Sequence, residues 1–162
     1  MTRYRSSTDA TARFAGVAFV ATLWLGLLIG VSFLATPVKF LAPSLTLATA
    51  LEVGQATFAL FTRVEWGLVI LLALAVAWVG RVNVKRSLWI GVGLLTLVLA
   101  AQSLWLLPIL DARVALIIAA ETPPPSEHHR VYVMLESAKL LTLAFISWRS
   151  FSKLGAMQRS IG

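Results

Sequence analysis

Long apolar stretches separated by short polar segments form the main pattern of this chain. Four of these stretches are expected to form helices that cross a lipid bilayer, at residues 14–36, 64–79, 88–107 and 131–148. An α-helix rises 1.5 Å per residue, so about 20 residues cross a hydrocarbon core of about 30 Å. Barrel strands alternate in polarity over about 10 residues, and these stretches do not. The pattern predicts an all-α, integral membrane four-helix antiparallel bundle with short interfacial helices, in one domain of residues 1–162.

Two shorter segments are predicted to be the interfacial helices. Residues 45–61 place polar side chains at three-residue spacing, at Thr46, Thr49, Glu52 and Gln55. This spacing draws one polar stripe along a helix, which either lies at the interface or runs directly into the second span. Residues 109–120 follow Pro108, carry Asp111 and Arg113, and are too few to cross the bilayer.

The composition supports a membrane location. Hydrophobic residues make up 59% of the chain and charged residues 13%, and the mean hydropathy is +0.85. Soluble domains average about 45–50% apolar and about 25% charged residues. The net charge of +7 would suggest nucleic acid in a soluble protein, but here it is expected to set membrane orientation, with no nucleic-acid partner. The absence of cysteine excludes disulfides and thiolate metal sites.

The distribution of lysine and arginine predicts the orientation of the spans. One side of the predicted topology carries nine of these residues: Arg3, Arg5, Arg13, Arg81, Lys85, Arg86, Arg149, Lys153 and Arg159. The other side carries four: Lys39, Arg63, Arg113 and Arg130. Because positive charge is retained in the cytoplasm, we expect a plasma (inner) membrane protein with both termini cytoplasmic.

Four polar residues within or at the edges of the spans are candidates for chemistry: Glu65, Gln102, Glu136 and Lys139. Glu136 and Lys139 are three residues apart and therefore share a helix face. Ionisable residues inside a membrane are costly, which makes them candidate functional sites. The alternative is a local ion pair that neutralises itself, with Lys139 extending towards an interface.

A second, weaker candidate is a metal site made by Glu127, His128 and His129 at the start of the fourth span. Adjacent residues of a helix point about 100° apart, so both histidines could not easily bind one ion without further ligands. The alternative is a pair of interfacial histidines. Neighbouring histidines also argue against a haem held by two axial ligands from facing helices. No nucleotide or phosphate motif is present, and the sequence identifies no cofactor.

Two glycines on the first span are predicted to serve helix packing. Gly26 and Gly30 have the spacing at which small residues let helices approach closely in lipid. We expect this face to contact either another helix of the bundle or a partner.

The first half of the chain resembles a family of small bacterial membrane proteins related to the transmembrane protein 205 group. The resemblance rests on LWLGLLIGVSFLATPVKF at residues 23–40, ALEVGQATFALFTRVEW at residues 50–66, and a histidine at the start of the last helix. It implies a four-helix membrane bundle. The role of that family is largely uncharacterised, so the resemblance implies no catalytic residue.

Three functions are compatible with these features. The first is a non-enzymatic accessory or packing subunit of a larger membrane complex. The second is a small-solute or ion transporter or channel subunit, which would use Glu65, Gln102, Glu136 and Lys139 as a polar path. The third is a membrane enzyme or metal-handling protein with its site at the outer face. The expected partners are the lipid bilayer and either a membrane protein or further copies of the chain.

Overall fold

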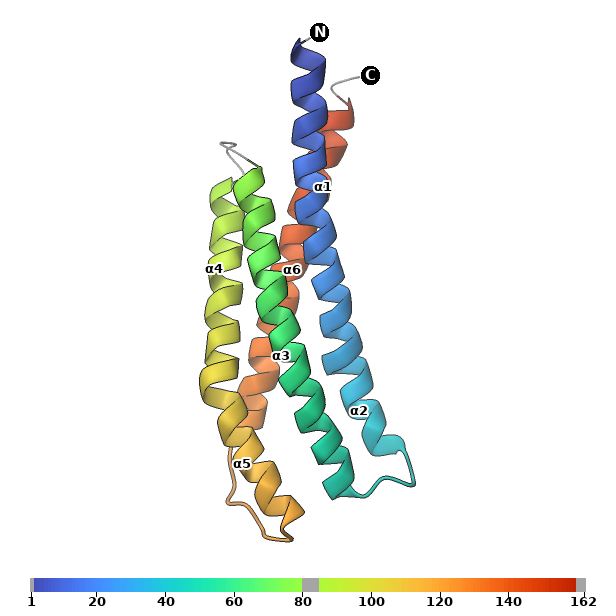
Figure 1. The fold of residues 1–162 in the computed structure, drawn as a ribbon, viewed down its shortest axis with the longest axis vertical. Helices are drawn as coiled ribbons and strands as arrows, with labels where there is room; N and C mark the ends of the chain where they lie inside the picture. The colour runs from blue at the N-terminus through green and yellow to red at the C-terminus, as the bar shows by residue number, and fades with distance from the viewer. Residues whose placement is uncertain (1, 80–84, 160–162) are drawn as a thin grey trace.

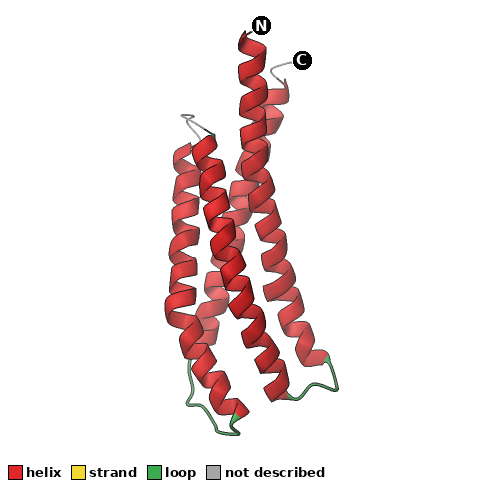
Figure 2. Cartoon of the chain, viewed as in Figure 1, coloured by secondary structure: helices red, strands yellow, loops and turns green. Residues whose placement is uncertain are grey.

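The computed structural model describes residues 2–79 and 85–159, and these residues are helical except in two loops (Figures 1 and 2). The elements are α1 (Thr2–Leu28), η1 (Ile29–Ala35), α2 (Thr36–Val38), η2 (Lys39–Leu41), α3 (Leu47–Trp78), α4 (Lys85–Ala101), η3 (Gln102–Leu106), α5 (Leu107–Ile118) and α6 (His128–Arg159). The segments η1 and η3 are π-helical, and η2 is a 3₁₀ turn. The described residues contain no strand, which confirms the all-α class.

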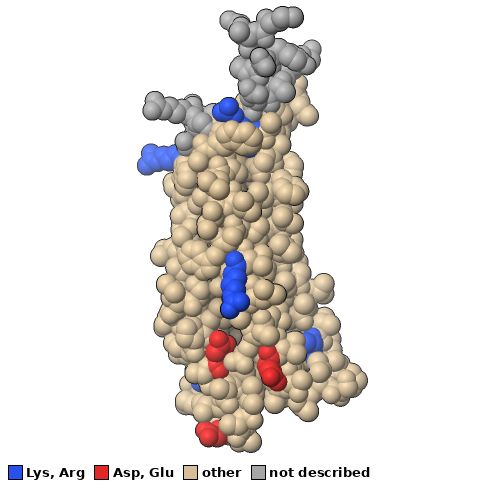
Figure 3. All heavy atoms as spheres, viewed as in Figure 1, with Lys and Arg blue, Asp and Glu red and all other residues tan. Residues whose placement is uncertain are grey.

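Four continuous helical spans are long and apolar enough to cross a membrane: Ala10–Leu41, Leu47–Trp78, Arg86–Ile118 and His128–Arg159. Their outward side chains are large and apolar, as at Phe19, Leu34, Leu74, Leu104 and Trp148. Figure 3 shows that most of one face is uncharged, with basic side chains near its upper end and near its middle and acidic side chains towards its lower end. The chain is therefore a small multi-pass membrane protein whose sides contact lipid.

The spans are antiparallel, and each packs against two others. The helix α1 contacts α3 and α6, and α4 contacts the same two helices from the other side. Both chain termini lie at one end of the bundle, at the top of Figure 1, which we call the terminal end. The opposite end, with the loops of residues 42–46 and 119–127, is called the loop end. Which end faces the cytoplasm stays a prediction.

Helix boundaries differ from the sequence prediction at both predicted interfacial helices. Residues 45–61 do not form a separate helix, because α3 runs without a break from Leu47 to Trp78. Of the two alternatives for this segment, continuation into the second span is the one observed. Residues 109–120 likewise belong mostly to α5, which continues directly from η3. Pro108 therefore does not end the third span.

Both spans that contain an internal proline pass through it by means of a π-helical segment. The segment η1 ends two residues before Pro37, and η3 ends two residues before Pro108. A proline has no amide hydrogen to donate, and its ring displaces the carbonyl of the residue four positions earlier. A wider turn before the proline accommodates this defect. Such π-helical turns commonly lie at functional sites.

The terminal half of the bundle contains a filled apolar core. Val17, Ala21, Leu72, Val76 and Leu95 come from three spans and have no exposed surface. From α6, Leu143 and Ile146 complete the same cluster. Two buried serines of α6, Ser147 and Ser150, also lie in this half, and the Thr22 hydroxyl donates to Ser147 at 3.2 Å. Close apolar contact is nevertheless the main interaction between the spans here.

Candidate functional site

Five side chains from all four spans meet in one buried cluster near the middle of the bundle. They are Trp24 on α1, Glu65 on α3, Gln102 on η3, and Glu136 and Lys139 on α6, and each is at most 2% exposed. We call them the central cluster. Gln102 lies at the midpoint of the span Arg86–Ile118. Glu136 is nearer a helix end, eight residues after α6 begins at His128.

Lys139 is the centre of this arrangement. Its Nζ atom lies 2.6 Å from Oε1 of Glu65 and 2.9 Å from Oε1 of Glu136. One ammonium group therefore joins α3 to α6 and also closes an ion pair within α6. The spacing of three residues places Glu136 and Lys139 on one helix face, as expected from the sequence. The pair is not a purely local one, because Glu65 on another helix completes it.

Two neutral side chains also donate hydrogen bonds to the carboxylates. The indole Nε1 of Trp24 donates to Oε1 of Glu65 at 3.1 Å. The amide Nε2 of Gln102 donates to Oε1 of Glu136 at 3.0 Å and to the backbone oxygen of Tyr132 at 3.5 Å. Each carboxylate thus has one oxygen that accepts two hydrogen bonds. These bonds link all four spans through side chains.

The cluster is not balanced in charge or in hydrogen bonding. With ordinary ionisation, two carboxylates and one ammonium carry a net charge of −1. Two buried acceptors, Oε2 of Glu136 and Oε1 of Gln102, have no hydrogen-bond partner. Buried polar atoms in folded proteins are nearly always partnered, so an unpartnered pair at one place requires an explanation.

A cavity of about 540 Å³ opens between the spans in the loop half of the bundle, and Glu136 is part of its wall. Most of its lining is apolar, with Phe33 and Phe40 on one side and Leu110 and Val114 on another. Its polar lining residues are Ser32, Thr36, Lys39, Gln55, Asp111, Arg113, His129, Tyr132 and Glu136. Glu136 therefore belongs both to the central cluster and to the cavity.

The other charges of the cavity are held in defined positions. Gln55 donates to the Oδ1 atom of Asp111 at 3.3 Å. The Arg113 guanidinium donates to the backbone oxygen of Pro124. The Lys39 ammonium lies against Gly54, in the space that a Cβ would occupy, and 5.1 Å from the centroid of the Phe40 ring. A glycine at position 54 is therefore what lets Lys39 approach α3.

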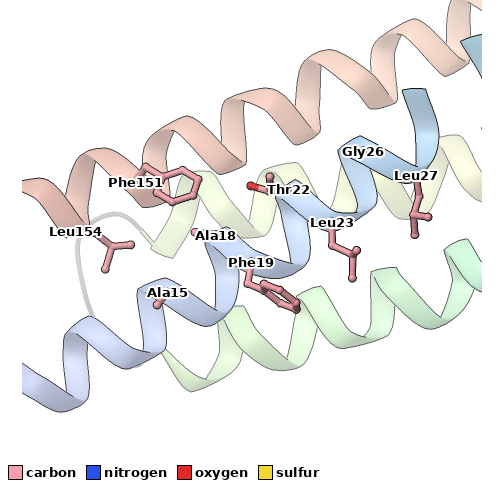
Figure 4. A pocket seen from close by; sticks show the side chains of 9 residues that line it. All are labelled: Ala15, Ala18, Phe19, Thr22, Leu23, Gly26, Leu27, Phe151 and Leu154. Atoms are coloured by element: carbon pink, nitrogen blue, oxygen red, sulfur yellow. The ribbon is translucent and has the colours of Figure 1, made fainter. Parts of the chain in front are cut away.

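The predicted packing glycines are not used between helices of this chain, as far as the structure describes it. A Cβ at Gly26 or at Gly30 would meet no atom within 4 Å. Gly26 instead lines a shallow outer groove of about 590 Å³ between α1 and α6, with Thr22, Leu23 and Phe151 (Figure 4). In contrast, a Cβ at Gly91 would lie 2.8 Å from Cδ1 of Ile146, so Gly91 does permit a close helix contact.

The three residues of the predicted metal site are not gathered around one point. Glu127 pairs with Arg130 at 2.9 Å, the Nδ1 atom of His128 lies 2.7 Å from Oγ of Ser126, and His129 lines the cavity. Across residues 2–79 and 85–159, no three histidine or carboxylate side chains are placed to hold a metal ion.

The structure thus brings together Glu65, Gln102, Glu136 and Lys139, the four polar residues that the sequence singled out. The sequence did not single out Trp24, which is fully buried. It also missed the roles of Tyr132 and Lys39 in the cavity wall. Trp24 lies five residues before η1 begins at Ile29, and nothing in the sequence distinguishes such an indole donor from a membrane-interface tryptophan.

No family model, curated protein or solved structure matches this chain. The resemblance to the transmembrane protein 205 group therefore stays a prediction.

Proposed function

We propose that this protein is a transporter or channel subunit for a small cation or proton, with the cavity as the entrance and the central cluster as the charged site. The observation that carries this proposal is the double position of Glu136. Its side chain lines the cavity and is also bonded to Lys139 and Gln102 at the middle of the bundle.

The cost of the cluster supports a functional role. An isolated charge at the centre of a span costs about 2.5–3.5 kcal/mol by membrane-insertion scales. A buried ion pair is often no more stabilising than apolar residues of the same volume. A protein that only packed against partners would have no need for three buried ionisable groups. The negative net charge of the cluster favours a positively charged ligand.

The two halves of the bundle suggest how movement would be controlled. The cavity occupies the loop half, and the filled apolar core closes the terminal half. Passage across the membrane therefore requires either a rearrangement of the terminal half or a path between copies of the chain. The π-helical segment η1 lines the cavity with Ser32 and Phe33, and η3 ends directly before the lining residue Leu107. Both are natural positions for such a rearrangement.

The test is ion flux into liposomes that contain the purified protein and an internal pH- or cation-sensitive dye. We expect the wild type to conduct protons, sodium or potassium above protein-free liposomes, and Glu136→Gln to reduce that flux at least about tenfold, as loss of an essential charged site does. Glu52→Gln is the matched control, because it makes the same change at an exposed position of α3. Absence of flux of all three ions in the wild type would overturn the proposal.

A second candidate, an accessory subunit that packs against a partner, is favoured by the outer groove. Gly26 lies in the groove, Gly30 follows one turn later, and neither contacts another described helix. Replacing both with Leu would then release the protein from a complex, as native mass spectrometry of gently solubilised membranes would show. Gly93→Leu is the control, because Gly93 is also open but lies on α4. Equal assembly of all three proteins would exclude this role for the groove.

A further inference from the structure

We propose that Glu136 holds an exchangeable proton on its Oε2 atom and that the resulting carboxylic acid pairs with the amide of Gln102. The inference deepens the proposed function, on which it rests for the route by which the proton arrives, and it names the transported or co-transported ion as H⁺.

The hydrogen bonds of the cluster locate the proton. Oε1 of Glu65 already accepts from Lys139 and Trp24, and Oε1 of Glu136 already accepts from Lys139 and Gln102. The Tyr132 hydroxyl, one turn earlier on α6, also interacts with the Glu136 carboxylate. Oε2 of Glu136 is buried and accepts no hydrogen bond of ordinary geometry. Oε2 is therefore the oxygen of Glu136 on which a proton can be placed, because Oε1 already accepts two hydrogen bonds.

Gln102 provides the complementary group. Its Nε2 donates to Oε1 of Glu136 at 3.0 Å, while its own Oε1 is buried without a partner. A carboxylic acid and a primary amide form a two-bond pair, in which the amide N–H donates to the acid carbonyl and the acid O–H donates to the amide carbonyl. One bond of that pair is present. A proton on Oε2 supplies the donor for the second and satisfies both unpartnered acceptors at once.

Charge and space also favour a proton over a larger cation. One added proton brings the net charge of Glu65, Glu136 and Lys139 from −1 to zero, which removes an uncompensated charge from the membrane interior. Both unpartnered oxygens have almost no accessible surface, so a sodium ion or an amine would have to displace neighbouring side chains. A proton needs no such space.

The groups that face Glu136 come from every packed element. Trp24 on α1 and Gln102 on η3 are neutral, Glu65 on α3 is acidic, and α6 contributes Lys139 and Tyr132. The charged or titratable groups of the adjoining cavity are Lys39, Asp111, Arg113 and His129. Lys139 lies between the two carboxylates and balances one of them. Glu136 is the one of the two that lines the cavity, through which protons can be exchanged with water.

The experiment is infrared difference spectroscopy of the full chain in lipid nanodiscs over a range of pH, in H₂O and D₂O. A buried carboxylic acid gives a C=O stretching band that moves to lower frequency on deuteration. We expect this band in the wild type, its loss in Glu136→Gln, and its retention in the exposed control Glu52→Gln. We expect it to shift to higher frequency in Gln102→Leu, because the acid loses its amide partner.

The Gln102→Leu variant keeps the carboxyl group, so it tests the assignment even if Glu136→Gln fails to fold. Absence of the band in the wild type at every pH would overturn the proposal, and so would a band that Gln102→Leu leaves in place. The outcome is independent of flux. A band without ion flux would retain the proton site and reject transport, whereas sodium or potassium flux without a band would retain transport and reject the proton.

Discussion

The terminal half and the loop half of the bundle use the same four spans in opposite ways. In the terminal half, apolar side chains of all spans fill the interior, and Gly91 brings α4 close to Ile146. In the loop half, the two prolines widen the helices into π-turns, a cavity opens, and the spans are joined through charged and polar side chains. The terminal half has the close apolar packing that stabilises a helix bundle. The loop half has the cavity and most of the polar side chains that could take part in chemistry.

The largest effect is expected from removing the ammonium group at the boundary between the two halves. Lys139→Met leaves two buried carboxylates close together without a positive partner, and breaking a buried ion pair in this way costs about 3–5 kcal/mol. Reversible unfolding in mixed micelles measures this cost. Arg86→Met, at an exposed site in the first turn of α4, is the control and should change the free energy of unfolding by less than about 0.5 kcal/mol.

The same site offers a sharper form of this test. When Glu65→Gln and Glu136→Gln are added to Lys139→Met, no charge remains in the cluster. We expect this triple variant to recover most of the lost stability, because buried ion pairs are often replaced by neutral groups at little cost. A triple variant as unstable as Lys139→Met alone would show that the cluster is structural and not retained for its charges.

A smaller loss is expected from Trp24→Phe. This change keeps most of the buried ring but removes the indole N–H that donates to Glu65 at 3.1 Å. Hydrogen bonds to charged groups contribute about 1.5–3 kcal/mol, and we expect a loss of unfolding free energy in this range. Trp89→Phe, at a partly exposed position on α4, is the control. Equal losses for the two variants would contradict the role assigned to Trp24.

The sequence predicted the four spans and their polar candidates, but not how the side chains of those spans come together. The four spans were predictable because lipid requires every backbone group to be bonded within a helix, which makes long apolar runs unambiguous. Glu65, Gln102, Glu136 and Lys139 were predictable as candidates because a polar residue in such a run stands out. Their convergence was not predictable. It depends on which face each helix turns towards the others, and a helix that is apolar on all sides gives no signal for that face.

The prolines are the clearest example of a feature whose structural effect the sequence did not predict. The sequence predicts that the third span ends before Pro108, because proline usually ends or kinks a helix. The helix instead continues through the π-turn of η3, and this turn contains Gln102. The sequence contains no local signal for a π-turn, since the turn results from packing around the proline. The same holds for Gly54, whose importance depends on the position of Lys39 on a different helix.

Gly91→Ala tests the close packing of the terminal half. The added Cβ would lie 2.8 Å from Cδ1 of Ile146, a side chain with no exposed surface and little freedom to move. Overpacking of this kind typically costs about 1–3 kcal/mol. Gly93→Ala, two residues away in open space, should be neutral or stabilising by up to about 1 kcal/mol through better helix propensity. Equal unfolding free energies for the two variants would contradict the contrast between the halves.

Gly54→Ala makes the same chemical change in the loop half, and there we expect the smallest effect on stability. The added Cβ would occupy the place of the Lys39 ammonium, which is the far end of a flexible side chain beside a cavity and can move away. The gain in helix propensity offsets the lost contact, so the free energy of unfolding should change by less than about 1 kcal/mol. The informative readout is chemical: Lys39, displaced towards water, should be acylated faster in nanodiscs, as peptide mass spectrometry would show. Gly67→Ala, at an open position of the same helix, should leave the acylation rate of Lys39 unchanged. A loss of stability as large as that of Gly91→Ala would mean that the loop half is packed as tightly as the terminal half. That result would contradict the contrast between a closely packed terminal half and a loosely packed loop half.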